Sequence, residues 1–312
     1  MKQVTGDSVR AEAPAAAVQN VSRAPEPLAP LPEHSPTRLP DEPLVVIEPS
    51  SGWVPVRFGD LWTYRELLYF LMWRDIKVRY KQAALGLAWV IMQPLFMALI
   101  FTVFMGWVRG FASEQVPYPL FVYAGLLVWT FFSNAVLNGG NSIVGNANLI
   151  TKVYFPRAII PAAAVGARLV DLGVAFVILV GLMAYYRVGV TWNTLMIVPL
   201  LLLVTLFSFG LGLLLSALNV KYRDVGLAVP VIIQLWMFVS PVIYPPSIVP
   251  AKWRTLYDLN PLVGMLEGFR AALFNLGFDW TALAVSAVST AALLVYAAYV
   301  FRRVERSFAD LA

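Results

Sequence analysis

Residues 193–218 read NTLMIVPLLLLVTLFSFGLGLLLSAL, a stretch without a single ionisable side chain. A helix of about 20 apolar residues is long enough to cross the hydrocarbon core of a bilayer, which is roughly 30 Å thick. The stretch therefore predicts a helix that spans a membrane, and it sets the fold class expected of the residues on either side.

Five further apolar runs predict five more spans, at residues 85–108, 119–137, 162–186, 226–244 and 280–301. The second and fifth of the six are short, and Pro230 and Pro241 predict that the fifth is bent or broken. Only 13% of all residues are charged and 59% are apolar, whereas about 25% are charged in an ordinary soluble domain. We predict an all-α integral membrane protein with six transmembrane helices in a domain over residues 85–312.

Residues 1–57 have a different composition. They hold ten prolines, which break helices, and their apolar residues are mostly alanine and scattered valine. No continuous apolar core of about 7–15 residues follows the charged start, so a secretory signal peptide is not predicted. We predict a disordered, Pro-rich cytoplasmic tail.

Residues 58–84 predict an amphipathic helix at the membrane interface. Residues 60–82 read DLWTYRELLYFLMWRDIKVRYKQ, with apolar side chains at helical spacing and five cations. Aromatic side chains favour the depth of the lipid headgroups and basic side chains favour anionic lipid. The segment is too charged to cross the bilayer, so we expect it to lie on it.

The basic residues predict the orientation, because cytoplasmic loops carry an excess of lysine and arginine. With the amino terminus inside, twelve basic residues fall on the inner side of the spans and five on the outer side. The sequence thus predicts a multi-pass protein of the cytoplasmic (inner) membrane with both termini in the cytoplasm. Nucleic acid is a weaker interpretation of the net charge of +5 and is not a predicted partner.

The predicted outer segment between the fifth and sixth spans, residues 245–279, contains a further short helix. Asn260 followed by Pro261 is a good helix start, with a cap and then a proline in the first turn. About 14 residues are too few to span, so we expect re-entrant or interfacial helices on the outer side. Glu267 and Arg270 are three residues apart and can pair.

Several kinds of chemistry are not predicted. The sequence has no cysteine, a single histidine (His34) in the tail, and no G-x-x-x-x-G-K-[ST] phosphate loop. We therefore expect no catalytic residue, no metal site and no ATPase in this chain. Arg168 and Asp171, within the third span, are interpreted as an intrahelical pair, and a gating role is the alternative.

One face of the first span is aromatic. At 100° per residue a single stripe holds Trp89, Gln93, Phe96, Phe104 and Trp107. On the fifth span another face holds Gln234, Phe238 and Pro241. Sugar rings pack their C–H faces on aromatic rings while amides bond to hydroxyls, so these faces can line a pathway for sugars. Contact with lipid or packing within the protein is the alternative.

The loop after the second span, residues 138–157, reads NGGNSIVGNANLITKVYFPR and is rich in amides. A short helix around residues 141–150 would project into the cytoplasm as a docking element. An ordinary connecting loop is the alternative.

Five blocks in order resemble the permease subunits of type-2 ABC exporters for polysaccharides and polyol phosphates, which move O-antigen, capsule and teichoic acid precursors. On the inner side they are WRDIKVRYKQAALGLAWVIMQPL (73–95), LITKVYFPRAIIP (149–161) and LNVKYRDVG (218–226). On the outer side they are SPVIYP (240–245) and LNPLVGMLEGFR (259–270). The resemblance runs from about residue 61 to the carboxyl end. It departs at Ala83 and Ala84, where the family often has a small hydroxyl residue.

The resemblance implies a second copy of the chain and two ABC ATPase subunits, which would bind ATP and Mg²⁺, while this chain holds no cofactor. The implied channel is lined by Trp89, Gln93, Phe96, Phe104, Trp107, Gln234 and Phe238. The implied ATPase coupling residues are Arg74, Asp75, Lys77, Arg79, Asn148, Thr151, Lys152 and Arg157. The implied outer gate is formed by Ser240, Pro241, Tyr244, Asn260, Pro261, Glu267 and Arg270.

The function that we predict is that of a transport subunit, not an enzyme. In this interpretation an ATP-driven exporter moves a lipid-linked polysaccharide, an O-antigen-like glycan, across the cytoplasmic membrane through a homodimeric channel. The alternatives are a type-2 ABC permease for a drug, a haem-like molecule or a lipid, a membrane glycosyltransferase, and an ATP-independent channel or scramblase. The glycosyltransferase would need clustered carboxylates or a nucleotide-sugar domain, and neither is visible.

Overall fold

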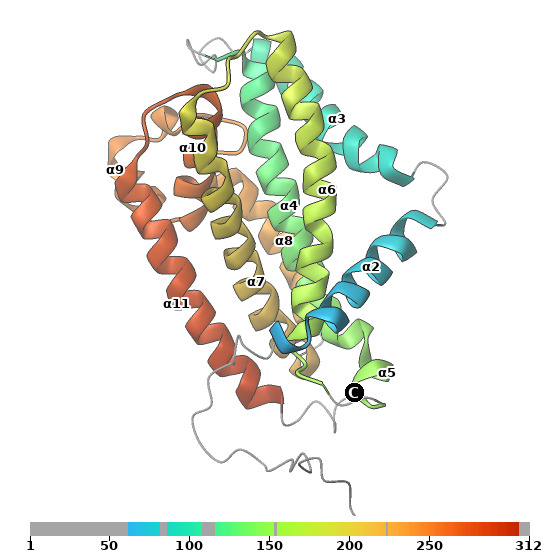
Figure 1. Ribbon diagram of the computed structural model, residues 1–312. Coiled ribbons are helices and arrows are strands. Elements are labelled where there is room, and N and C mark those ends of the chain that lie inside the picture. The colour runs from blue at the N-terminus through green and yellow to red at the C-terminus, as the bar shows by residue number, and fades with distance from the viewer. Residues whose placement is uncertain (1–61, 82–85, 108–115, 153–154, 223, 306–312) are drawn as a thin grey trace, which may run out of the picture. The chain divides into compact units, whose positions relative to one another are not determined.

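The computed structural model describes residues 62–81, 86–107, 116–152, 155–222 and 224–305. All of them belong to the second of the two units of the chain, Gly52–Ala312. The predicted tail, residues 1–57, lies outside the described residues. Within the described ranges every regular element is a helix (Figure 1), in agreement with the predicted all-α class.

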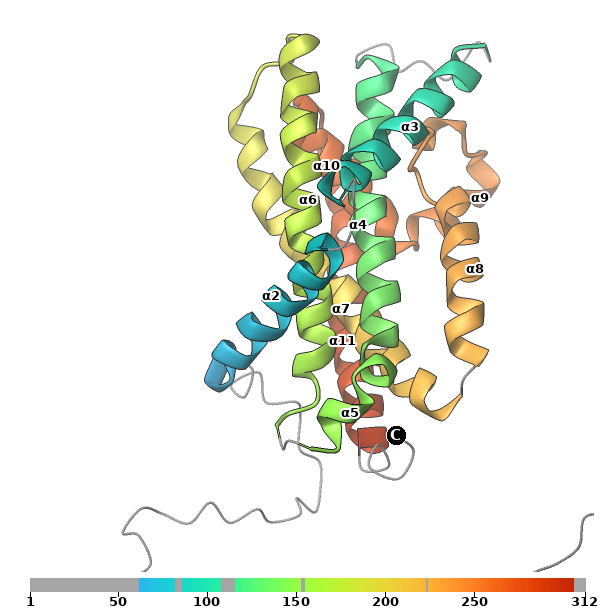
Figure 2. The same ribbon diagram turned by 90° about the vertical axis from the view of Figure 1, so that its right-hand side faces the viewer.

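The described part contains the following elements in chain order: α2 (Arg65–Lys81), α3 (Gly86–Trp107), α4 (Tyr118–Gly145), α5 (Ala147–Ile150), α6 (Ile159–Tyr185), the 3₁₀ turn η1 (Trp192–Met196), α7 (Ile197–Lys221), α8 (Asp224–Val239), the 3₁₀ turn η2 (Pro246–Ile248), α9 (Ala251–Asp258), α10 (Pro261–Phe274) and α11 (Trp280–Glu305). Helix α4 packs against α3, α6, α7 and α8, and α2 packs against α6 (Figures 1 and 2).

Four helical segments are long and apolar enough to cross a membrane: Tyr118–Gly145, Ile159–Tyr185, Trp192–Lys221 and Trp280–Glu305. They correspond to the second, third, fourth and sixth predicted spans. At the first and fifth positions the apolar helices are shorter, Ala88–Phe104 and Asp224–Val239. A total of six spans therefore stays a prediction.

The second span is longer than the sequence predicts. Helix α4 has 28 residues and continues to Gly145, so only Ala147–Ile150 forms a separate turn after it. The expected helix around residues 141–150 is therefore wrong in its bounds. The reason is tertiary: a methyl group built on Gly139 would lie 3.0 Å from the Cα atom of Gly212 in α7. Such close approach of two helices stabilises them in a membrane and outweighs the low helix propensity of glycine and asparagine.

The predicted bend in the fifth span falls at its second proline. Helix α8 includes Pro230 but ends at Val239, two residues before Pro241. The chain then turns through residues 240–245 toward the short helix α9.

A cluster of aromatic rings joins three helices of the domain, α4, α7 and α8. Phe132 of α4 stacks on Phe207 of α7 with ring centroids 5.8 Å apart, and both meet the edge of Trp236 of α8. Pairs of this kind contribute roughly 0.5–1.5 kcal/mol beyond the area that they bury. The cluster thus holds α8, the shortest of these three helices, against α4 and α7.

Candidate transport site

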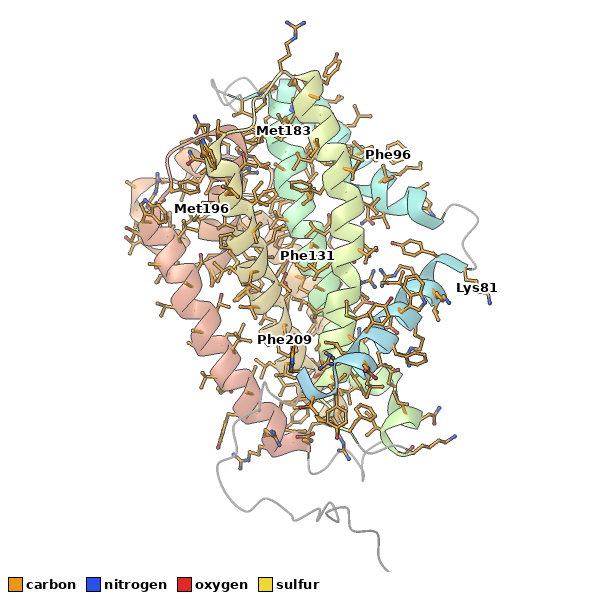
Figure 3. The ribbon with its side chains drawn as sticks, in the orientation of Figure 1. Lys81, Phe96, Phe131, Met183, Met196 and Phe209 are labelled. Carbon is orange, nitrogen blue, oxygen red and sulfur yellow. The ribbon has the colours of Figure 1, made fainter. Side chains whose placement is uncertain are left out.

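The predicted channel face of α3 points away from the other helices that the structure describes. Trp89 is 57% exposed, Phe96 49% and Phe104 67%, whereas Pro94 and Ala98 on the opposite side are buried. Figure 3 shows Phe96 on the side of α3 away from α4 and α6. Gln93 is also exposed. The side chain of Trp107 lies outside the described residues.

The predicted channel face of α8 is exposed in the same way. Gln234 and Phe238 are exposed, while the buried residues Ile233 and Met237 lie about 100° further round the helix. In Figure 2, α3 crosses in front of α4 and α8 lies beside it. The described residues of the single chain therefore leave both predicted channel faces uncovered, and α4 packs against both α3 and α8.

A cluster of charged side chains joins α2 to α6. Asp171 accepts hydrogen bonds from Arg79 and from the hydroxyl of Tyr80, and its Oδ2 lies 3.1 Å from Nη1 of Arg168. Burial, together with the hydrogen bond to Asp171, raises the pKa of Tyr80 to about 12. The hydroxyl therefore stays protonated and donates a hydrogen bond to Asp171. The predicted pair of Arg168 with Asp171 is confirmed, and the structure adds Arg79 and Tyr80 to it.

Two of the predicted residue groups meet at this cluster. Arg79, which the sequence places in the ATPase coupling group, lines a cavity of about 160 Å³ together with Trp89 and Gln93 of the predicted channel. Helices α2 and α3 are consecutive in the chain but fold back onto α6 and α4, and this brings the two groups together. No spacing in the sequence indicates such a meeting.

Arg74, another predicted coupling residue of α2, contacts the start of α5. Arg74 pairs with Asp75 at 2.8 Å and donates to Oδ1 of Asn146, also at 2.8 Å, at the junction of α4 and α5. Lys77 lies 5.3 Å from the ring centroid of Trp73. Asn146 was not predicted as a site residue, although it belongs to the amide-rich loop.

The α5 turn presents its polar side chains to the outside. Asn148, Thr151 and Lys152 are all exposed, and the hydroxyl of Thr151 lies within hydrogen-bond distance of the carbonyls of Ala147 and Asn148. Arg157, after this turn, donates to the backbone carbonyl of Glu305 at 2.6 Å. The α5 turn and the end of α11 therefore lie at the same end of the helical domain.

The predicted outer gate is organised around a fully buried arginine. Arg270 of α10 is 1% exposed and pairs with Glu267 at 2.7 Å, as predicted. Its guanidinium also donates to the carbonyls of Pro241 at 2.5 Å, Val242 at 2.7 Å and Phe121 at 3.3 Å. One side chain thus ties α10 to α4 and to the turn after α8.

Asn260 organises the other end of α10. Its Oδ1 accepts from the backbone N–H of Leu262 at 3.1 Å, which confirms the predicted cap, and also from Nε1 of Trp236 at 3.1 Å. Its Nδ2 donates to the hydroxyl of Ser240 at 2.9 Å. The buried Ser240 and the helix start are therefore held by one amide.

The remaining two predicted gate residues, Tyr244 and Pro261, also form hydrogen bonds in this region. The hydroxyl of Tyr244 donates to the carbonyl of Phe238 at 3.0 Å, which closes the turn after α8. The carbonyl of Pro261 accepts from Ser286 of α11 at 2.6 Å. The structure thus brings the whole predicted gate group into one region, built on α10.

Comparison with known proteins identifies the family of this chain. Residues 66–274, from the start of α2 to the end of α10, match the family described as ABC-2 type transporter. The chain belongs to the ABC-2 type transporter family. With four helices able to cross a membrane, it is a multi-pass membrane protein of that family.

The relatives of this chain include proteins with more specific names. The chain is 30% identical to the O-antigen export system permease protein RfbA of Myxococcus xanthus, over 80% of this chain and 97% of the relative. It is 26% identical to a protein of the same name from Klebsiella pneumoniae, over 79% and 95%. It is 24% identical to the polysialic acid transport protein KpsM of Escherichia coli, over 65% and 79%.

Asn260→Ala is expected to destabilise this ABC-2 chain at the start of α10. The change removes the cap of the helix, which costs about 1 kcal/mol, and leaves the indole of Trp236 and the hydroxyl of Ser240 without this partner. We expect the purified Asn260→Ala protein to melt at a lower temperature than wild type. Asn260→Asp should lower the melting temperature less, because aspartate keeps the oxygen that caps the helix. Equal melting temperatures of Asn260→Ala and wild type would contradict the role of this amide.

Proposed function

We propose that this chain is the membrane-spanning subunit of an ATP-driven exporter that moves lipid-linked polysaccharide across the cytoplasmic membrane. The observation that carries the proposal is the similarity, over 80% of the chain and 97% of the relative, to a permease named for O-antigen export. The O-antigen-like cargo is taken from that name. In this proposal both termini are cytoplasmic and α3 and α8 complete a set of six spans.

The energy would come from a separate partner. The sequence has no phosphate loop, so we propose two copies of an ABC ATPase that bind ATP and Mg²⁺ at the α5 end. The exposed Asn148, Thr151 and Lys152 are available for that contact. The bond from Arg74 to Asn146 would pass a movement of α5 to α2 as well as to α4.

The channel would form between two copies of the chain. The uncovered faces of α3 and α8 carry Trp89, Phe96 and Phe238 beside Gln93 and Gln234. Aromatic rings offer sugars a flat apolar surface and the two amides can bond to hydroxyls. The gate group around Arg270 would close the outer end, and its turn after α8 would move when the channel opens.

The proposal is tested by deleting the gene in its native host and restoring it. Surface polysaccharide and lipid-linked glycan retained at the inner face are measured together. We expect loss of the former and accumulation of the latter, and both should be reversed by the restored gene. Unchanged surface polysaccharide without accumulation would contradict polysaccharide export and direct the search to another cargo.

The channel face makes a separate prediction. Replacing Trp89, Phe96 and Phe104 together with alanine should lower export to a small fraction of wild type, because the ring surface for sugars is removed. The matched control is Tyr296→Ala, an exposed aromatic residue of α11 that is 57% exposed. Export is measured as surface polysaccharide at equal amounts of membrane-inserted protein. Wild-type export by the triple variant would contradict a channel lined by α3.

A further inference from the structure

The cavity among α2, α3, α4 and α6 has an excess of positive charge. Arg79 and Arg168 face it with two positive charges, and Asp171 faces it with one negative charge. Both carboxylate oxygens of Asp171 are occupied, Oδ2 by the two arginines and Oδ1 by Tyr80. The net charge of these three side chains is one positive charge, so an anion of one charge would balance the site and a doubly charged anion would exceed that balance by one.

The cavity also has hydrogen-bond donors that the protein does not use. Nε of Arg168 is buried and has no hydrogen-bond partner among the described residues. Gln93, Thr130 and Asn134 also line the cavity. Their side chains form no hydrogen bond with any residue that the structure describes. A buried donor without an acceptor is costly, and a charged side chain within a membrane-spanning helix marks a functional site more often than not.

We propose that this cavity binds the phosphate or diphosphate group of a lipid-linked substrate. Guanidinium groups match phosphate oxygens with paired, charge-assisted hydrogen bonds. The cavity volume of about 160 Å³ is well above the roughly 10–15 Å³ that a single water molecule needs, so a phosphate or diphosphate group has room in it. The proposal rests on the function proposed above and names the part of the substrate that the chain would hold.

The neighbouring surface favours a lipid over a free anion. Trp89 stands at the cavity and is 57% exposed. Further along α3, Leu99 and Val103, which are not among the proposed channel residues, are exposed and apolar. Figure 3 shows the contrast between Phe131, a cavity residue that lies among the helices, and Phe96 at the periphery. An apolar tail leaving the cavity would thus meet an apolar helix face.

An ion-pair cluster that only joins α2 to α6 makes a different prediction for Asp171. In that case Asp171→Asn and Arg168→Gln should both loosen the protein and have parallel effects. For an anion site the two changes differ in sign, since Asp171→Asn raises the positive charge of the cavity and Arg168→Gln lowers it. The sign of the Asp171→Asn effect therefore separates the two explanations.

The test is calorimetric titration of the full chain, purified in dodecyl maltoside, a detergent without phosphate. The probe is farnesyl diphosphate, compared with inorganic pyrophosphate and farnesol. We expect the wild-type protein to bind farnesyl diphosphate saturably. Arg168→Gln should bind it at least about tenfold more weakly, because this variant loses a charge-assisted hydrogen bond. Asp171→Asn should bind it equally or more tightly. Arg254→Gln, which removes an exposed cation of α9, is the charge-matched control and should bind like wild type.

Asn134→Leu keeps the test decisive if a charge variant does not fold. Leucine is nearly the same size as asparagine, and the substitution breaks no side-chain hydrogen bond among the described residues. It removes one hydrogen-bond donor group from the cavity, so we expect it to weaken the binding of farnesyl diphosphate severalfold. Tighter binding of farnesyl diphosphate than of pyrophosphate assigns the site to a lipid head. Equal binding of the two assigns it to a free oxyanion and contradicts a lipid ligand.

Three results would overturn the site. They are farnesol binding as tightly as farnesyl diphosphate, no weakening in either Arg168→Gln or Asn134→Leu, and a loss in Asp171→Asn that parallels Arg168→Gln. Absence of binding together with lost surface polysaccharide in the deletion strain would reject this site and leave the proposed function intact. Binding with unchanged surface polysaccharide would reject the proposed function and keep a phosphate site.

Discussion

Arg270→Ala is expected to be the most damaging single substitution in the chain. It would leave the carbonyls of Pro241, Val242 and Phe121 without this donor and would leave Glu267 without its cation. Removing one partner of a buried ion pair costs about 3–5 kcal/mol. Arg270 also stacks on the ring of Phe121 at 3.6 Å, a contact that adds to the loss.

The measurement is the melting temperature and the monodispersity of the detergent-purified protein. We expect Arg270→Ala to be poorly recovered or to melt well below wild type. Arg270→Lys should be intermediate, because a lysine keeps the charge but not the planar fork that serves several carbonyls. Arg254→Ala, on the exposed face of α9, is the control. A melting temperature of Arg270→Ala equal to that of this control would contradict the role of Arg270.

Gly264→Val is expected to force α10 away from α11. A Cβ atom on Gly264 would lie 2.3 Å from the carbonyl oxygen of Ala282 and 2.4 Å from Oγ of Ser286. The first of these atoms belongs to the backbone, so it cannot move aside by rotating a side chain. Overpacking typically costs about 1–3 kcal/mol, and the substitution would also disturb the hydrogen bond from Ser286 to the carbonyl of Pro261.

The same substitution at Gly181 of α6 is the matched control. Among the described residues no atom lies within 4 Å of a Cβ built there, and valine has a higher helix propensity than glycine. Melting temperature should therefore fall sharply in Gly264→Val and stay level or rise in Gly181→Val. Similar values for the two variants would show that α10 and α11 do not rely on this contact.

The local features of the helices were predictable from the sequence. The cap of Asn260 and the pair of Glu267 with Arg270 depend on residues within one helical turn. The pair of Arg168 with Asp171 has the same origin. Helical spacing alone brings such residues together, so their contacts do not require knowledge of the fold.

The hydrogen-bond partners that link helices far apart in the chain could not be predicted from the sequence. Phe121 and Pro241 lie 149 and 29 residues from Arg270 in the chain, and they contribute carbonyl groups, which every residue has. Arg79 and Asp171 are 92 residues apart. A sequence shows which side chains need partners but does not show which backbone atoms will be near, because that depends on how the helices pack.

The sequence by itself determined that this is an all-helical membrane protein, because long uncharged runs have one stable form in lipid. It also placed the short helix after Asn260 and predicted the family, since five blocks stand in order along the chain. Only the tertiary structure decided where α4 ends, what Arg270 holds and that α2, α3, α4 and α6 enclose a cationic cavity. Those features arise from the close approach of helices far apart in the chain, and hydrophobic periodicity carries no information about which helices meet.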